Sequence, residues 1–325
     1  LGSRLNIRQT SYNWDAFAQN AWLAQVDIDE AELNKPTLRP DLGVAADLND
    51  FLNMLEDELA QVQLPSYRPW AQWCQQTGNR YDAAAEHRQQ PGAVLNPYAM
   101  VSRIFAQMRP DDIVVCGNAS ACILPFQVGA LQKDQRLFSN SGSASMGYDL
   151  PAALGAASAA RAAGVARRVI CFVGDGSLQM NIQELQTLKT TGLDVIVIVL
   201  NNRGYLSIWQ THENFFGRVI GATPESGVDF PDFTAVERDY GLRAESIATQ
   251  GDLPRLDALL QGGGPLLIDL HVDPRQEFVP RIKSRVNEQG QFVTPELDDM
   301  HPFLDPAELR RVRDEALAVR AVPTV

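Results

Sequence analysis

The sequence has little of several features that would point to particular classes of protein. Acidic residues outnumber basic ones by 40 to 28, and the formal net charge of −12 at pH 7 argues against a nucleic-acid-binding surface. No apolar run reaches the roughly eighteen residues that a membrane span requires, and no signal peptide is evident. The four cysteines contain no Cys-x-x-Cys pair, and the four histidines lack metal-ligand spacing. We therefore expect reduced thiols, no zinc site, no membrane or nucleic-acid partner, and a cytoplasmic location.

The chain does have the length and composition of a large folded protein. With 325 residues, 45% of them hydrophobic, it can bury a sizeable core in more than one domain. Strands are predicted at 111–116, 136–138, 168–173, 195–200, 243–247 and 266–272. Helices are predicted before, between and after them at 98–108, 177–188, 232–240, 253–260 and 306–322. This alternation predicts an α/β fold, in which helices cover both faces of a parallel sheet.

The Gly-Asp-Gly-Ser segment at 174–177 is the most informative part of the chain. It follows the apolar run 168–173, which is typical of a buried parallel strand that ends in a tight turn. A helical pattern comes next, and a second apolar run at 194–200 predicts the neighbouring strand. This strand–helix–strand order places Asp175 and Asn202 at the carboxyl ends of adjacent strands, where open α/β sheets bind ligands.

The residue types at these strand ends suit a diphosphate and its metal. The helix after Ser177 presents free backbone N–H groups and the positive end of its dipole to an anion. The carboxylate of Asp175, the amide oxygen of Asn202 and a backbone carbonyl are hard oxygen ligands, which suit Mg²⁺ bridging a diphosphate. Taken alone, Asn201 and Asn202 equally fit a turn after a strand.

These segments resemble the thiamine diphosphate (ThDP) enzymes of the acetolactate synthase, pyruvate decarboxylase and benzoylformate decarboxylase group. The matching residues are Gly-Asp-Gly-Ser, the Glu-Leu pair at 184–185 and Asn-Asn-Arg-Gly-Tyr at 201–205. The resemblance implies ThDP and Mg²⁺ as cofactors; FAD is possible but not indicated. It implies Asp175, Asn202 and the carbonyl of Gly204 as metal ligands. For the diphosphate it implies Gly174, Gly176, Ser177 and Tyr205.

A second block, at 139–155, resembles the pyrimidine-binding loop of the same family and the small-residue helix after it. The resemblance implies that Met146 wedges between the two rings of ThDP, and that the backbone of Ala144 and Met146 holds the aminopyrimidine. It also places Asn118 and Ser120 in the other phosphate-side loop. The alternatives are a methionine that fills the core and a polar loop that needs no ligand.

Trp209 is a further candidate, because the family's segment after Asn-Asn folds over the reacting ring of ThDP. On that resemblance, residues 205–210 line the side where the acceptor binds, and Trp209 has a catalytic role. The alternative is that Trp209 packs under a helix. His212, which follows in the sequence, fits a surface residue better than a catalyst.

The resemblance also divides the chain into segments. Residues 1–62 match the C-terminal half of a Rossmann-like central domain, and residues 63–91 are expected to form a linker with one amphipathic helix. Residues 92–275 match the domain that binds the diphosphate and Mg²⁺, and 276–325 form a C-terminal tail. The family's pyrimidine-binding domain has no counterpart here, and that domain carries the glutamate that hydrogen-bonds N1′ of the pyrimidine. We expect it on a missing segment or another polypeptide, within a homodimer or homotetramer in which two chains build each site.

Three functions are compatible with these residues. The first is a ThDP- and Mg²⁺-dependent carboligase of the acetolactate synthase type. It decarboxylates a 2-oxo acid, pyruvate for preference, and transfers the two-carbon unit to a carbonyl acceptor in sugar or branched-chain amino-acid biosynthesis. The second is a simple 2-oxo acid decarboxylase, and the third is a non-catalytic ThDP-binding fragment that mediates assembly. Intact Asp175, Asn202 and Met146 favour an enzyme.

Overall fold

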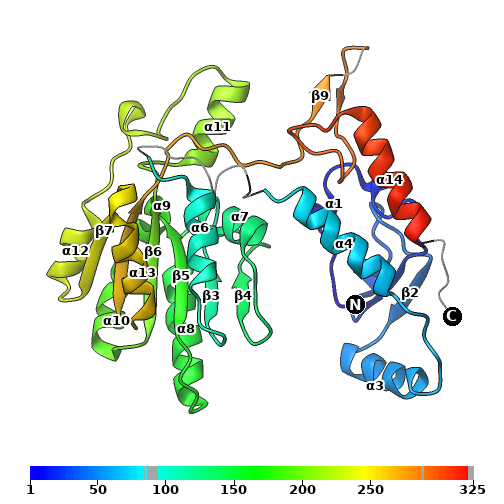
Figure 1. Ribbon diagram of the computed structural model, residues 1–325, viewed down its shortest axis with the longest axis horizontal. Helices are drawn as coiled ribbons and strands as arrows, with labels where there is room; N and C mark the ends of the chain where they lie inside the picture. Colours follow the sequence, from blue (N-terminus) through cyan, green and yellow to red (C-terminus); the bar gives the residue numbers. More distant parts are fainter. Residues whose placement is uncertain (84, 86–93, 287–288, 321–325) are drawn as a thin grey trace. The chain divides into compact units, whose positions relative to one another are not determined.

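The structure is a computed structural model that describes residues 1–83, 85, 94–286 and 289–320 (Figure 1). Two compact units make up the chain. The terminal unit comprises Leu1–Tyr81 and Val279–Val325, and the sheet unit comprises Asp82–Phe278. Parts of two predicted segments, residues 84 and 86–91 of the linker and 321–322 of the last helix, lie outside the described residues. No helix within the described part of the chain is long and apolar enough to cross a membrane.

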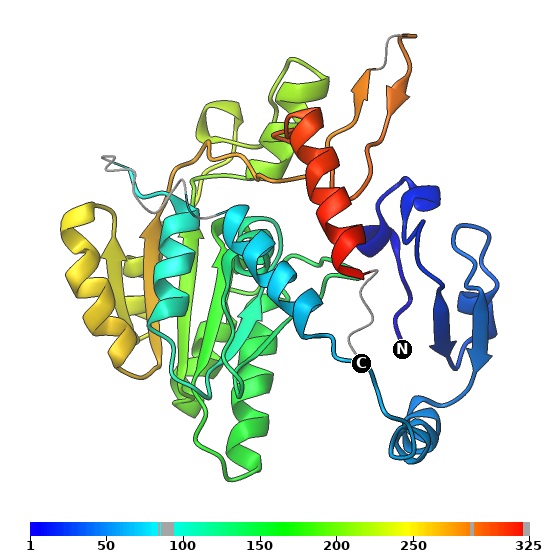
Figure 2. The ribbon, with the colours of Figure 1, turned by 45° about the vertical axis from the view of Figure 1, so that its right-hand side comes forward.

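The sheet unit is built on six parallel strands in the order β4-β3-β5-β6-β8-β7 (Figures 1 and 2). The strands are β3 (Ile113–Cys116), β4 (Arg136–Ser139), β5 (Val169–Gly174), β6 (Val195–Asn201), β7 (Arg243–Ile247) and β8 (Leu266–His271). Each lies within two residues of its predicted position, so the predicted parallel α/β sheet is confirmed.

Side-chain alternation along the central strands creates a core on each face of the sheet. In β5, Ile170 and Phe172 point into one cluster of buried apolar residues, whereas Val169, Cys171 and Val173 point into the other. Helices cover both clusters, as a parallel sheet requires. The first cluster is covered by α6 (Pro97–Ala106), α7 (Ser120–Val128) and α13 (Leu253–Gln261), and the second by α8 (Asp149–Ala162), α9 (Asp175–Met180), α10 (Glu184–Thr191) and α12 (Phe233–Asp239).

Three shorter or more exposed elements complete the sheet unit. They are α11 (Leu206–Phe215) and the 3₁₀ helices η2 (Pro224–Ser226) and η3 (Gln250–Asp252). The start of α6 shows how the sequence fixes a helix boundary. Asn96, for example, caps α6 by accepting from the backbone of Tyr98 at 2.9 Å, and Pro97 occupies the first helical position.

The prediction of one continuous helix over 177–188 is wrong. The structure has two helices, α9 and α10, separated at residues 181–183. Asn181 ends α9 with φ −138° and ψ 39°, and its side-chain nitrogen donates to the carbonyl of Gly147 at 2.7 Å. The apolar spacing continues across the break, so a periodic sequence pattern does not reveal it. Gly192 ends α10 in the left-handed conformation that glycine adopts readily.

The terminal unit contains two small sheets and several helices. Strands β1 (Ala24–Asp27) and β2 (Leu42–Ala45) are parallel, and β9 (Arg285–Val286) and β10 (Phe292–Val293) are antiparallel. The helices are α1 (Ile7–Thr10), η1 (Trp14–Ala16), α2 (Glu30–Leu33), α3 (Leu48–Leu59), α4 (Arg68–Arg80) and α14 (Pro306–Arg320). Helix α4, from the predicted linker, contacts α14, and Tyr81 donates to Glu308 at 2.8 Å. The assignment of these segments to domains of the resembled family stays a prediction.

Candidate functional site

The carboxyl edge of the sheet brings together residues that are far apart in the sequence. Asp175 begins α9 directly after β5, Asn202 follows β6, and Ser120 begins α7 after β3. All three are buried, and one end of the Asn202 carboxamide lies 3.4 Å from the hydroxyl of Ser120. Parallel strands that end at one edge account for this convergence, because β3, β5 and β6 are neighbours in the sheet.

The carboxylate of Asp175 is held by backbone donors. Its Oδ1 accepts from the N–H of Gly176 at 2.7 Å, and its Oδ2 accepts from the N–H of Gly204 at 3.1 Å. Burial nevertheless raises the pKa of Asp175 to about 7, because desolvation outweighs these hydrogen bonds. A cation placed beside this carboxylate would favour its ionised form.

Three oxygen-bearing groups meet at Asp175. One end of the Asn202 carboxamide lies 2.7 Å from the carbonyl oxygen of Gly204 and 3.3 Å from Asp175 Oδ2. If that end is the nitrogen, it donates to both oxygens; if it is the oxygen, three acceptors face one another and need a cation between them. The group has only one carboxylate. It therefore differs from centres with three or more His, Cys, Asp or Glu ligands, none of which occurs among the described residues.

Three loops at this edge hold a non-glycine residue in a backbone conformation with positive φ. Ala119 follows β3 with φ 46° and ψ −125°, Ala144 follows β4 with φ 50°, and Arg203 follows β6 with φ 58°. Such conformations are costly and gather at functional sites. The first two loops are tied together, because the side chain of Asn118 donates to the carbonyl of Ala144 at 3.0 Å.

The loop at 140–148 and the start of α9 share a buried hydrogen-bond network. The hydroxyl of Ser177 accepts from the N–H of Gly147 at 2.8 Å and donates to Asp149 Oδ2 at 2.5 Å. Asp149 is fully buried, and burial raises its pKa to about 6. Gly147 has a φ of +80°, and a Cβ there would lie 2.7 Å from Met180, so the close approach needs glycine. Because the Ser177 hydroxyl is engaged, only its backbone N–H is left for a diphosphate.

Met146 lies in this loop and is partly buried. Among the described residues it belongs to neither core cluster, which does not support the reading of Met146 as a core filler. Asp149 was missed in the sequence, although an acidic residue next to the apolar Leu-Pro-Ala-Ala-Leu run of α8 could have indicated it.

Tyr205 and Trp209 lie on the loop and helix after Asn202. The ring of Tyr205 occupies the space that a side chain at position 176 would need, and it meets Phe230 edge-on with ring centroids 5.6 Å apart. Trp209 packs against the first core cluster and also lines a cavity of about 430 Å³ with Asn202 and Gly204. The structure therefore supports packing for Trp209 and also places it near the predicted metal ligands.

Comparison with known proteins gives matches to thiamine diphosphate enzymes. The profile of the thiamine pyrophosphate enzyme family, C-terminal TPP binding domain, matches residues 119–270. Acetolactate synthase isozyme 1 large subunit of Escherichia coli (strain K12) is 29% identical over 290 residues, which cover 87% of this chain and 48% of that protein. Acetolactate synthase large subunit of Parasynechococcus marenigrum (strain WH8102) is 30% identical over 303 residues, 91% of this chain and 47% of that protein. The chain thus spans about half the length of the curated relatives it matches.

A solved structure also matches. An X-ray structure of a candidate thiamin diphosphate-dependent enzyme from Mycobacterium smegmatis has a TM-score of 0.47 and 26% sequence identity. The match covers 56% of this chain and 32% of that one.

Proposed function

Because the chain belongs to the thiamine diphosphate enzymes related to acetolactate synthase large subunits, we propose that it works as a ThDP- and Mg²⁺-dependent carboligase. In this proposal the protein decarboxylates a 2-oxo acid, pyruvate for preference, and transfers the two-carbon unit to a carbonyl acceptor. The names of the relatives favour this function over simple decarboxylation and over a purely structural role.

The observation that carries the proposal is the group of oxygens around Asp175. The Asn202 carboxamide lies 2.7 Å from the carbonyl oxygen of Gly204 and 3.3 Å from the buried carboxylate of Asp175. Hard oxygen ligands of this kind suit Mg²⁺, which is usually held by few protein groups together with substrate phosphate oxygens. The residues therefore fit the metal, with Asp175, Asn202 and the carbonyl of Gly204 as its ligands.

The surrounding loops fit the diphosphate and the pyrimidine. Gly174 has open space where a side chain would stand, so its backbone stays accessible. We assign the diphosphate to the three strand ends and the pyrimidine to the loop after β4, where Ala144 and Met146 would hold it. The diphosphate residues are Asn118, Ser120, Gly174, Gly176, Ser177 and Tyr205. Trp209 would line the acceptor side through the cavity it shares with Asn202.

ThDP, when bound, supplies the electron sink that decarboxylation of a 2-oxo acid needs. The chain's own residues bind and orient it, since no side chain here is assigned to the proton chemistry at N1′. We place the glutamate for that step outside these 325 residues, on a further segment or a partner chain. The curated relatives, which are about twice as long, support this placement.

The test is calorimetry of ThDP binding in the presence of Mg²⁺. We expect Asp175→Ala to abolish binding, because the diphosphate would face the sheet without its bridging cation. Asp239→Ala, an exposed acid on α12, is the control and should bind like the unchanged protein. Equal ThDP affinity in Asp175→Ala and the unchanged protein would contradict the assignment.

A second experiment tests the missing glutamate. The 325-residue chain, purified without a companion polypeptide, is expected to bind the cofactor but not to consume pyruvate. Robust decarboxylation by this chain alone would mean that it contains the proton-relay residue itself.

A further inference from the structure

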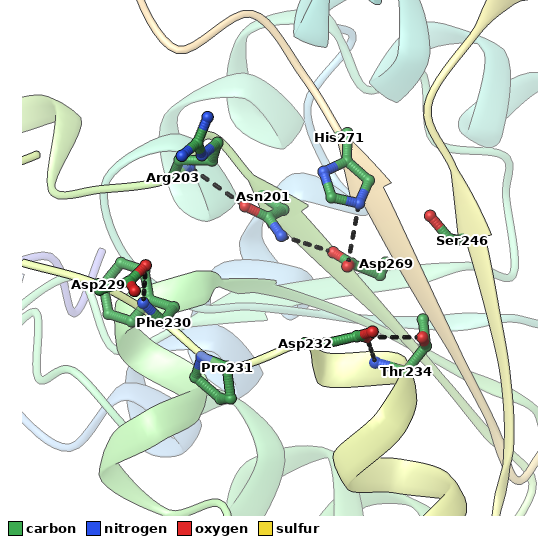
Figure 3. A pocket seen from close by; sticks show the side chains of 10 residues that line it. All are labelled: Asn201, Arg203, Asp229, Phe230, Pro231, Asp232, Thr234, Ser246, Asp269 and His271. Atoms are coloured by element: carbon green, nitrogen blue, oxygen red, sulfur yellow. Dashed lines mark hydrogen bonds and ion pairs between the residues drawn. The ribbon is translucent and has the colours of Figure 1, made fainter. Parts of the chain in front are cut away.

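A second group of polar side chains lies at the ends of β6 and β8, beside the proposed metal ligands. Asn201, Asp269 and His271 line one cavity of about 370 Å³ with residues from β7 and the start of α12 (Figure 3). In the sheet register Asn201 is paired with His271, and Asp269 lies two residues earlier on the same strand. Side chains two residues apart point to one face of a sheet, so the three are neighbours. Asn202, the next residue after β6, lies at the proposed metal site.

These side chains form a continuous series of hydrogen bonds (Figure 3). His271 Nε2 lies 3.2 Å from Asp269 Oδ2, and Asn201 Nδ2 donates to Asp269 Oδ1 at 2.9 Å. Asn201 Oδ1 in turn accepts from the backbone N–H of Arg203 at 3.2 Å. The next backbone N–H, that of Gly204, donates to Asp175. Arg203 and Gly204 are consecutive residues, so the backbone joins the last two hydrogen bonds. Through this link, the series connects His271 at the cavity with the carboxylate proposed to bind the metal.

Asp269 fixes the orientation of the Asn201 carboxamide. Asp269 is only 3% exposed, and an ionised carboxylate there can only accept hydrogen bonds. The NH₂ group of Asn201 must therefore face it, because the opposite orientation would put two acceptors together in a buried site. The oxygen of Asn201 is then left to accept from Arg203, two residues along the chain, as in an Asx turn.

This turn determines where the metal ligands lie. Arg203 has a φ of 58°, which is unfavourable for a residue other than glycine and persists only where its surroundings enforce it. The turn contains Asn202 and Gly204. The N–H of Gly204 donates to Asp175, and the carbonyl of Gly204 lies against the Asn202 carboxamide. Without the hydrogen bond from the Arg203 N–H to Asn201, the backbone at Arg203 can relax. The Asn202 side chain and the Gly204 backbone would then move.

We propose that Asn201 and Asp269 are positioning residues, which hold the turn at 202–204 in the geometry that binds the cation. The proposal rests on the function proposed above, since it concerns the same metal site. Outer partners of metal ligands typically change metal affinity about 10- to 100-fold when they are removed. We expect a loss of that size in Mg²⁺ affinity.

The experiment measures Mg²⁺ affinity at fixed ThDP by calorimetry, together with the melting temperature of the cofactor-free 325-residue chain. Asp269→Leu removes the acceptor at similar volume, and Asn201→Asp places two acids against each other. Both are expected to bind Mg²⁺ about tenfold or more weakly. The double variant Asn201→Asp/Asp269→Asn restores one donor facing one acceptor and leaves an acceptor for Arg203, so it should regain most of the affinity of the unchanged protein.

Ser246→Ala is the matched control. Ser246 lies beside Asp269 in the register of β7 and β8 and lines the same cavity, but it has no part in the series of bonds. The Mg²⁺ affinity of the Ser246→Ala variant should equal that of the unchanged protein. If the single variants bind Mg²⁺ like the unchanged protein, or if the double variant stays as weak as Asn201→Asp, the proposal is wrong.

The two proposals fail differently. If the unchanged chain does not bind ThDP with Mg²⁺, the proposed function fails. If it binds both and Asp269→Leu binds them equally well, only the positioning role fails. Should Asp269→Leu not fold, as its melting curve would show, the comparison of Asn201→Asp with the double variant still decides.

Discussion

The two units of the chain differ in how they are held together. Nearly all the buried apolar residues of the described structure lie in the sheet unit, and the terminal unit contributes only Val26, Leu33 and Leu38. The terminal unit instead leaves large apolar side chains exposed, among them Trp22 and Met54. Its two-stranded sheets are too small to bury two faces, and isolated pairs of strands are marginal in water. The scaffold of the proposed cofactor site therefore carries its own core.

One ion pair from each unit shows the same contrast. In the sheet unit, Arg168 and Asp112 form a two-pronged pair, with 3.0 Å between Nε and Oδ1, and both side chains are buried. In the terminal unit, Arg80 and Glu315 lie 3.3 Å apart with more than a third of each side chain exposed. Exposed pairs contribute little to stability, whereas breaking a buried pair leaves a charge without a partner. Whether an ion pair is buried or exposed thus decides how strongly its loss changes the stability of the protein.

The largest expected effect comes from breaking the buried pair. Asp112→Asn should lower the stability of the sheet unit by about 3–5 kcal/mol, because Arg168 would keep its charge in a buried site. Glu315→Gln should leave the terminal unit unchanged. Urea unfolding followed by hydrogen exchange reads both units in one sample. Equal effects in the two units would remove the contrast between them.

Apolar truncation should sharpen the same comparison. Leu188 on α10 is fully buried in the second core cluster, and Leu188→Ala should cost about 3 kcal/mol through lost burial and the cavity left behind. Leu52 on α3 is 42% exposed, and Leu52→Ala should have no measurable effect. The measurement is thermal unfolding of each variant. A large loss in Leu52→Ala would show that α3 is covered in solution.

The effect that is smallest for each step of its measurement, one pH unit, concerns a buried acid in the sheet unit. Glu237 on α12 is fully buried, neither of its carboxyl oxygens has a hydrogen-bond partner, and burial raises its pKa from 4.5 to about 9. Between those values the folded state keeps a proton that the unfolded state has released. The free energy of unfolding is therefore undiminished below pH 4.5. It falls as the pH rises toward 9, by at most about 1.4 kcal/mol per pH unit.

Glu237→Leu should remove this dependence. Its melting temperature should exceed that of the unchanged protein at pH 6, and by a larger margin at pH 8. The control is Glu184→Gln on α10, which replaces an acid that is not buried. A constant difference between Glu237→Leu and the unchanged protein across this pH range would mean that Glu237 titrates alike in the folded and unfolded states.

Sequence patterns were sufficient for the sheet because its strands are uniform apolar runs. In β5 and β6, β-branched residues predominate, and nearly all their positions are buried, so the pattern and the burial agree. Strand β2 is a short Leu-Gly-Val-Ala segment that is mostly exposed, and it gave no comparable signal. The break between α9 and α10 was missed because it depends on a bond from Asn181 to Gly147, a contact between distant parts of the chain.

For the candidate site, the sequence predicted the residues at the carboxyl ends of the strands. It did not predict the buried acids and backbone conformations around them. The order of strand, helix and strand was enough to expect Asp175 and Asn202 near each other. The buried acids Asp149 and Asp269 were missed, because an acidic residue in a sequence reads as a surface charge until its partners are known. The left-handed backbone of Ala119 and Ala144 was equally hidden, since alanine does not indicate such a conformation.

The two adjacent asparagines at the end of β6 limit how the length of this strand can vary. Asn201 bonds to Asp269, and Asn202 lies beside the carboxylate of Asp175. Inserting or deleting one residue in β6 would exchange the two positions, because a shift of one residue turns every side chain to the other face. Such a change would disturb the core and the proposed metal ligands together. Length changes in this region should therefore be tolerated in the loop after α11 and not in strand β6.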